Sequence, residues 1–219
     1  MKEQGKRLMT IGVVCLVLLL DQTLKIAVKT SMILGERVQI FGQKWANLYF
    51  IENDGMAFGF DFMGTILLTA FRIVAVGLLV YYIHRILRER RLPWAYFVCV
   101  GLVLAGAAGN IIDNLFYGAI FTQSTPYTVA SLVPFGEGYS GVMCGRVVDM
   151  FYFPLIDTWL PYNWPLIGGK HFVFFSPIFN LADAAITCGG LVIIFCFRQS
   201  LQYSLTLFSR KKAGENDNK

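Results

Sequence analysis

The sequence predicts an all-α membrane protein with four transmembrane helices, a small extracytoplasmic β-rich subdomain and an extended extracytoplasmic loop. Hydrophobic residues make up 56% of the 219 residues, charged residues only 15%, and the mean hydropathy is +0.56. A water-soluble fold could not bury that much apolar surface. Four apolar segments are each long enough to cross a bilayer, namely residues 8–28, 63–83, 93–113 and 178–197. We therefore expect a single membrane domain over residues 1–219.

The positive charges predict how these helices are oriented. Lys and Arg cluster at three places: Lys2, Lys6 and Arg7; Arg85, Arg88, Arg90 and Arg91; and Arg210, Lys211 and Lys212. By the positive-inside rule, both termini and the loop 84–92 are cytoplasmic, and segments 29–62 and 114–177 lie outside. The net charge of +5 is not gathered on an aromatic-rich face, so we expect no nucleic-acid partner.

Short β-prone runs in the first outer segment predict a small sheet. RVQIFG at 37–42 and ANLYFI at 46–51 are rich in Ile, Val, Tyr and Phe, and the turn-forming Asn53, Asp54 and Gly55 follow. The second outer segment mixes Tyr and Trp with Pro and Gly, a composition typical of the headgroup level of a bilayer. We expect it to lie against the membrane.

Four aspartates lie on the predicted outer side: Asp21 ends the first span, Asp113 ends the third, Asp183 opens the fourth, and Asp149 lies in a loop that closes back on the membrane. A charged side chain at the centre of a span costs about 2.5–3.5 kcal/mol on insertion scales. Avoidance of the bilayer centre therefore explains any one of these positions. It explains all four together much less well, which indicates a shared site.

Two asparagine–aspartate pairs have helical spacing. Asn110 and Asp113 end the third span, and Asn180 and Asp183 open the fourth. Residues at i and i+3 share a helix face, so each pair presents an amide and a carboxyl together. Polar helix packing, or an N-cap at Asn180, would also explain them. Three glycines would let a neighbouring helix approach the third span closely: Gly101, Gly106 and Gly109.

The setting of Asp149 indicates acid–base chemistry. Apolar residues flank it in GRVVDMFYFP, so its carboxyl would be partly dry. If Asp149 and Asp183 meet, repulsion and desolvation would make them share a proton, leaving one as base and the other as acid. The base would take a proton from a water attacking a peptide carbonyl, and the acid would protonate the oxyanion and the leaving amine. This is the arrangement of an aspartic peptidase.

Other chemistries fit the sequence less well. The only histidines are His84, at a cytoplasmic span end, and His171, so a His-rich metal site is not available on the outer face. His171 lies in GGKHFVFF, without a recognisable nucleophile motif. Neither a phosphate loop nor a dinucleotide fingerprint is present. We expect no metal and no cofactor.

At this point the motifs resemble a known family, the bacterial lipoprotein signal peptidases (signal peptidase II). Its characteristic pieces occur in order along the whole chain: DQTLK at 21–25, ENDGMAFGF at 52–60, AGAAGNIIDN at 105–114, GRVVDMFYFP at 145–154 and FNLADAAITCG at 179–189. Each piece alone is weak, but their order, combined with four spans and this topology, is specific.

The resemblance implies a membrane aspartic endopeptidase that removes signal peptides from diacylglyceryl-modified prolipoproteins, cleaving before the lipidated cysteine. It implies no cofactor and places the enzyme in the bacterial inner membrane, among phospholipids, with its active site facing the periplasm. Asp149 and Asp183 would be the catalytic pair. Residues that would position the substrate or support the pair are Asp21, Lys25, Asn53, Gly55, Asn110, Asp113, Asn180 and Ala182. We expect a monomer.

Asp21 and Lys25 also stand at i and i+4, the spacing of a helical ion pair. A simple interfacial salt bridge would explain that spacing as well. The resemblance assigns the two residues a supporting role in the site.

The chain departs from the family pattern in two ways. Asn114 stands where the motif usually continues with an arginine, and Arg72 within the second span or Arg146 could supply the missing cation. We expect Arg72 to face the bundle, although snorkelling toward the headgroups would also explain it. The stretch from 114 to 145 is longer than in the family and could be a lid, a substrate contact or an expanded surface loop.

Two other functions compete with peptide cleavage. A transporter could use the acidic cluster to relay protons or bind a cation, but span four offers only Thr187 and Cys188 as polar groups after Asp183. A non-catalytic assembly factor could dock lipidated proteins, in which case Asp149 and Asp183 would be dispensable. Mutation of the two aspartates separates the three functions.

Overall fold

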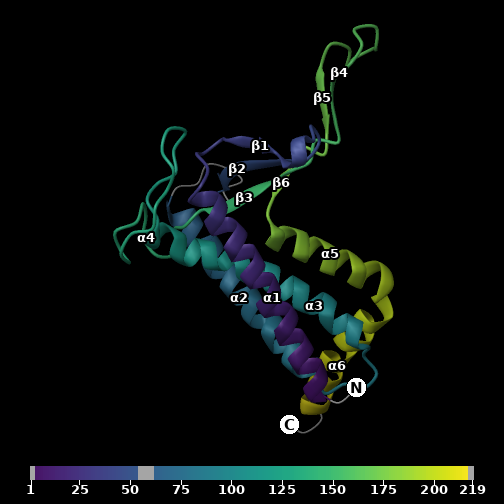
Figure 1. Ribbon diagram of the computed structural model, residues 1–219. Helices are drawn as coiled ribbons and strands as arrows, with labels where there is room; N and C mark the ends of the chain where they lie inside the picture. The colour runs from purple at the N-terminus through teal and green to yellow at the C-terminus, as the bar shows by residue number, and fades with distance from the viewer. Residues whose placement is uncertain (1–2, 54–61, 217–219) are drawn as a thin grey trace. The chain divides into compact units, whose positions relative to one another are not determined.

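The computed structural model describes residues 3–53 and 62–216, so the predicted site residue Gly55 lies outside the described part. The helices are α1 (Glu3–Lys29), α2 (Phe62–Ile86), α3 (Trp94–Ile112), α4 (Gly118–Ile120), α5 (Leu181–Cys196) and α6 (Arg198–Asn216) (Figure 1). The strands are β1 (Arg37–Gln39), β2 (Asn47–Asn53), β3 (Val147–Tyr152), β4 (Ile156–Trp159), β5 (His171–Phe174) and β6 (Ile178–Phe179). A 3-10 turn spans Ile40–Gly42, and a π-helical turn spans Asp113–Tyr117.

The chain packs as two compact units. The helical unit comprises Met1–Asp21, Thr69–Ile111 and Leu181–Lys219. The sheet unit comprises Gln22–Leu68 and Ile112–Asn180. The division between the units falls within two helices: α1 divides after Asp21 and α2 divides before Thr69.

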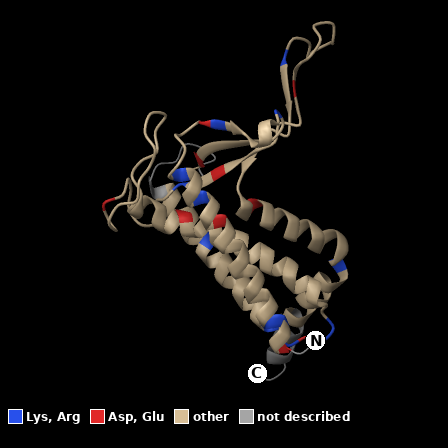
Figure 2. Cartoon of the chain, in the orientation of Figure 1, with Lys and Arg blue, Asp and Glu red and all other residues tan. Residues whose placement is uncertain are grey.

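Three helices are long and apolar enough to cross a membrane: Glu3–Lys29, Gly64–Ile86 and Trp94–Ile120. They overlap the first three predicted spans, 8–28, 63–83 and 93–113. The last of them continues beyond α3 through the π-helical turn and α4. Figure 2 shows the charged residues gathered toward the ends of the long helices, as expected when apolar middles face lipid.

The helix at the predicted fourth span, 178–197, is shorter than the sequence predicted. Its first residues form β6, α5 begins only at Leu181, and α6 leaves α5 at an angle of 92°. The 16 residues of α5 measure about 24 Å at 1.5 Å per residue, less than a hydrocarbon core of about 30 Å. The described residues thus hold three candidate spans, or four if α5 and α6 cross as one broken span. The bend lies where the sequence turns from apolar to polar at Arg198.

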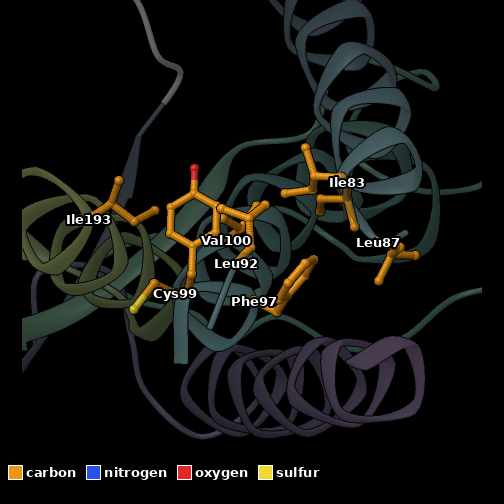
Figure 3. Close-up of a cluster of buried hydrophobic side chains, with 9 residues drawn as sticks. Ile83, Leu87, Leu92, Phe97, Cys99, Val100 and Ile193 are labelled. Carbon is orange, nitrogen blue, oxygen red and sulfur yellow. The ribbon is translucent and has the colours of Figure 1, made fainter. Parts of the chain in front are cut away.

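Buried apolar side chains form the core of the helical unit. Ile83 from α2 and Ile193 from α5 pack with side chains of α3 in one cluster (Figure 3). Lys6 of α1 donates hydrogen bonds to the carbonyl oxygens of Glu89 and Leu92, at 2.8 and 2.7 Å. These bonds hold the start of α1 against the loop between α2 and α3.

A four-stranded antiparallel sheet organises the sheet unit, in the order β1-β2-β3-β6 (Figure 1). The β-prone runs of the first outer segment form β1 and β2, which confirms the predicted small sheet. In the register of β2 and β3, Ile51 is opposite Asp149 and Glu52 is opposite Val148. One residue of β2 bulges between Leu48 and Ile51. Strand β3 comes from the second outer segment, where the sequence predicted a loop, and β6 comes from the start of the predicted fourth span.

One face of this sheet packs on a second buried cluster. This cluster includes Phe50, Val148 and Met150 of the sheet, Val28 of α1, and Phe121 of the segment 114–145, called the long segment below. All three sheet residues are fully buried. Since neighbouring residues in a strand point to opposite faces, Asp149 lies on the other face of β3 from Val148 and Met150.

Strands β4 and β5 form a separate two-stranded hairpin (Figure 1). Nearly all of its strand residues are exposed, and Nε2 of His171 lies 2.6 Å from Oδ1 of Asp157 across the strands. This contact gives His171 a partner at the protein surface. The sequences of the two strands, IDTW and HFVF, show no clear alternation of polar and apolar residues, because both faces of the hairpin carry apolar side chains.

Candidate active site

Asp183 in the helical unit is held by an asparagine amide. It lies in the first turn of α5, and its Oδ1 accepts a hydrogen bond from Nδ2 of Asn110 at 2.8 Å. Asn110 is near the end of α3. The structure therefore brings together two residues that the sequence predicted to share a site.

Close packing of α3 against α5 makes this hydrogen bond possible. A Cβ atom on Gly106 would stand 2.2 Å from the carbonyl oxygen of Ala182, and one on Gly109 would stand 2.8 Å from Oδ2 of Asp21. Only glycine at position 106 lets the backbones of α3 and α5 approach so closely, and Gly109 leaves room for the Asp21 carboxylate of α1. The close approach expected from the glycines of the third span is confirmed at these two positions.

Asp21 satisfies the beginning of α5. Its carboxylate is buried, and Oδ1 accepts a hydrogen bond from the backbone N–H of Ala182 at 2.9 Å. The first amides of a helix have no partner within the helix, and a negative charge there also interacts favourably with the helix dipole. Asp21 therefore fixes the turn that carries Asp183.

Asp183 and Asn110 line a pocket of about 400 Å³ in the helical unit. The third polar or charged lining residue is Arg72 of α2, and the rest of the wall is apolar, with Ala75 and Ala107 among the smallest side chains. Arg72 therefore lines the same pocket as Asp183. The pocket combines an apolar wall with a few polar groups, as ligand sites commonly do.

Asp149 in the sheet unit is also held by an asparagine amide. Its Oδ1 accepts a hydrogen bond from Nδ2 of Asn180 at 2.6 Å, and the same amide donates to the carbonyl oxygen of Val148 at 3.3 Å. Both Asp149 and Asn180 are buried. The asparagine of the FNLAD motif thus contacts the aspartate of the GRVVD motif directly.

Asp113 joins α1 to the same strand. Its Oδ2 forms an ion pair with Nζ of Lys25 at 2.8 Å, and both side chains are fully buried. The same oxygen accepts the backbone N–H of Val148 at 3.3 Å, and Oδ1 accepts Nε2 of Gln22 at 2.8 Å. Asp113 therefore fixes the backbone beside Asp149. Gln22 carries no signal in the sequence beyond its place in DQTLK.

Asn114, at the position where the family pattern has arginine, makes a structural contact. Its Nδ2 donates to the carbonyl oxygen of Gly145 at 2.8 Å, and the Gly145 N–H donates back to the Asn114 carbonyl at 2.9 Å. Arg146, one candidate for the missing cation, lies with Nη1 3.7 Å from Oε2 of Glu52. Asn53 ends β2 opposite Val147 of β3.

Sequence reasoning missed three residues of the sheet unit, Lys29, Glu52 and Ser124, which are hydrogen-bonded to one another in the interior. Lys29 could be read as an ordinary helix-end cation, and Glu52 as the first letter of a motif. Ser124 lies in the long segment and has no sequence signal at all.

Among the described residues, neither the Cys144 thiol nor a metal-binding cluster adds to the candidate site. Cys144 is buried, and this burial raises the pKa of its thiol, which therefore stays protonated near neutral pH. Within residues 3–53 and 62–216, no group of three His, Cys, Asp or Glu side chains could hold a metal ion. The candidate site consists of the carboxylates and amides described above.

Comparison with known proteins gives consistent matches. A family model described as signal peptidase (SPase) II matches residues 13–198. The lipoprotein signal peptidase of Porphyromonas gingivalis is 42% identical over 212 residues, covering 97% of this chain and 91% of that protein. The corresponding protein of Amoebophilus asiaticus is 33% identical, covering 94% and 84%. A solved structure of a bacterial membrane enzyme, 22% identical, has the same fold with a TM-score of 0.55 and covers 88% of each chain.

Proposed function

Because the chain belongs to the signal peptidase II family, we propose that it removes signal peptides from diacylglyceryl-modified prolipoproteins and cleaves before the lipidated cysteine. Asp149 and Asp183 are the proposed catalytic pair. One observation carries this assignment: each carboxylate accepts a hydrogen bond from an asparagine amide of its own unit, Asn180 in one case and Asn110 in the other. Such a donor fixes the orientation of the carboxylate.

In the proposed mechanism the two carboxylates share one proton. The ionised carboxylate takes a proton from a water as that water attacks the scissile carbonyl, and the protonated one donates to the developing oxyanion. The proton then passes to the leaving amine as the tetrahedral intermediate collapses. Asp21 and Asp113 act behind the pair, the first by satisfying the start of α5 and the second by fixing β3.

The pocket beside Asp183 suits the apolar part of this substrate. Its wall is built from α2, α3 and α5, and small side chains such as Ala75 and Ala107 leave room for apolar side chains of a signal peptide. The acyl chains of the modified cysteine would remain in lipid. The proposed location is the inner membrane with the site facing the periplasm, which the basic loop 84–92 at the opposite end of α3 from Asn110 supports.

Arg72 is the proposed replacement for the arginine that Asn114 lacks. It shares the pocket with Asp183, whereas Arg146 has Glu52 as a partner. Arg72→Leu should impair prolipoprotein processing while Arg88→Leu, which removes an exposed arginine of the same unit, should not. Normal processing by Arg72→Leu would refute this role.

The deciding experiment incubates the purified protein with a diacylglyceryl-modified prolipoprotein. Wild type should release the signal peptide, and Asp149→Asn and Asp183→Asn should each abolish release at unchanged melting temperature. Cleavage that survives either substitution would remove that residue from the pair. Absence of cleavage by wild type, together with proton or cation flux in liposomes, would favour the transport alternative.

A further inference from the structure

A buried ionic cluster lies behind strand β2 in the sheet unit. The side chain of Glu52 is 2% exposed, and its Oε1 accepts hydrogen bonds from Nζ of Lys29 and, at 2.7 Å, from the hydroxyl of Ser124. Lys29, whose side chain is fully buried, also donates to Oγ of Ser124 at 3.1 Å. Residues from α1, β2 and the long segment 114–145 therefore meet in one buried polar contact.

Two aromatic rings and a second cation complete this cluster. Nζ of Lys29 lies 5.4 Å from the ring centre of Phe121 and 5.1 Å from that of Tyr139, and both rings also belong to the long segment. Such rings stabilise a buried ammonium group. Arg146 stands 3.7 Å from Oε2 of Glu52, an oxygen with no hydrogen-bond partner among the described residues.

The register of the sheet relates this cluster to Asp149. Glu52 lies opposite Val148, so their side chains are on the same face of the sheet. Val148 and Met150 are buried in the cluster of apolar residues that includes Phe121. Asp149 lies between them and points to the opposite face. The ionic cluster therefore lies on one face of strands β2 and β3, and the carboxyl group of Asp149 lies on the other face.

We propose that Lys29, Glu52 and Ser124 form a positioning cluster for Asp149, and that the long segment 114–145 serves the reaction by supplying Ser124. This role rests on the proposed function of Asp149. Loss of the Ser124 hydroxyl removes one of the two hydrogen bonds to a buried carboxylate oxygen. The strand pair is then free to shift relative to α1, and Asp149 shifts with β3. Small displacements of a reacting group, on the order of 1 Å, can lower turnover about 100-fold.

The cluster gives the long segment a role different from a lid or a passive surface loop. Its backbone folds back on itself through an isolated bridge between Phe121 and Leu132, and Ser124 lies within that turn, buried. A lid would need to leave the body of the protein during each turnover. Ser124 would have to abandon a buried carboxylate to do so, which is costly.

The experiment compares Ser124→Ala with Ser131→Ala in the full-length protein reconstituted in lipid nanodiscs. Ser131 is the matched control because it lies in the same segment but is exposed. Ser124→Ala should lower kcat for a diacylglyceryl prolipoprotein by about 10-fold or more, at unchanged KM and unchanged melting temperature. Ser131→Ala should retain wild-type kcat. Backbone amides of Val147–Tyr152 should exchange with deuterium faster in Ser124→Ala than in the control.

Several results would overturn the positioning role. These are a kcat for Ser124→Ala equal to that of Ser131→Ala, a loss confined to KM, a loss that follows the melting temperature, and unchanged amide exchange in β3. If wild type itself does not cleave the prolipoprotein, the proposed function fails. The amide exchange of β3 still decides in that case whether Ser124 holds the strand.

Discussion

Asn180 donates a hydrogen bond from its side-chain amide to Oδ1 of Asp149 at 2.6 Å, and it stands three residues before Asp183 in the chain. The chain passes from the sheet unit to the helical unit directly after Asn180. One short segment therefore begins with a residue that holds the first proposed catalytic carboxyl group and ends with the second. A substitution at Asn180 therefore changes a residue at the boundary between the two units.

Asn180→Ala should lower kcat by about 10- to 100-fold with little change in KM. The substitution removes the donor to Asp149 and also its bond to the carbonyl oxygen of Val148, so the carboxyl group loses its fixed orientation. The measurement is steady-state cleavage of a prolipoprotein across substrate concentrations.

Asn47→Ala is the matched control for this variant. Asn47 is equally buried in the sheet unit, and its side chain bonds to Arg37 and to the carbonyl oxygen of Lys44. Its loss should cost about 1–3 kcal/mol of stability and leave kcat unchanged. Equal kcat losses in the two variants would show that Asn180 acts only through stability.

Asp113→Asn should destabilise the protein by about 3–5 kcal/mol, because it leaves Lys25 without its buried carboxylate. Lys25→Met combined with Asp113→Leu should recover much of that loss, since an apolar pair of similar volume avoids the buried charge. Unfolding in detergent, followed by circular dichroism, measures both effects.

An exposed ion pair provides the contrast. Glu3 lies 3.9 Å from Arg88, and the two side chains are 57% and 75% exposed. Glu3→Gln should therefore change stability by no more than about 1 kcal/mol. A comparable effect of Glu3→Gln and Asp113→Asn would contradict the view that burial makes the Lys25–Asp113 pair essential.

The sequence predicted the site best where the residues that make a contact lie within one recognisable motif. The glycines before Asn110 predicted close helix packing, and Gly106 indeed meets the backbone of Ala182. The Asn–Asp spacing identified both amide and carboxyl groups, although each amide bonds to the aspartate of another motif rather than to its own neighbour.

The same reasoning failed where partners are distant in the chain. The i, i+4 spacing of Asp21 and Lys25 could not reveal that Lys25 also forms an ion pair with Asp113, 88 residues further along the chain. Strand β3 was read as a loop because VVDMFY is buried at most of its positions and does not alternate. Glu52 and Ser124 were missed because the local sequence does not indicate which distant residues bond to the buried Lys29.

The pocket beside Asp183 gives a prediction about substrate binding. Ala75→Phe places a large ring in the pocket, whereas Val74→Phe puts the same ring on a neighbouring, 60% exposed position of α2 outside the pocket lining. Ala75→Phe should raise KM for the prolipoprotein about 10-fold or more, because the ring takes space needed by the signal peptide. Val74→Phe should bind substrate as wild type does, and an equal KM for the two variants would move the substrate elsewhere.

Replacing Gly106 should separate Asn110 from Asp183. The Cβ of Gly106→Ala would fall 2.2 Å from the carbonyl oxygen of Ala182 and 2.6 Å from Cγ1 of Ile186, so α5 must move away from α3. Overpacking of this kind costs about 1–3 kcal/mol, and the hydrogen bond that orients Asp183 would lengthen. Gly77→Ala is the control, because nothing lies within 4 Å of the added methyl group on α2. Alanine also favours a helix over glycine by about 1 kcal/mol. We therefore expect Gly106→Ala to lower both melting temperature and cleavage rate, and Gly77→Ala to lower neither. Full activity in Gly106→Ala would show that contact between α3 and α5 is not needed to orient Asp183.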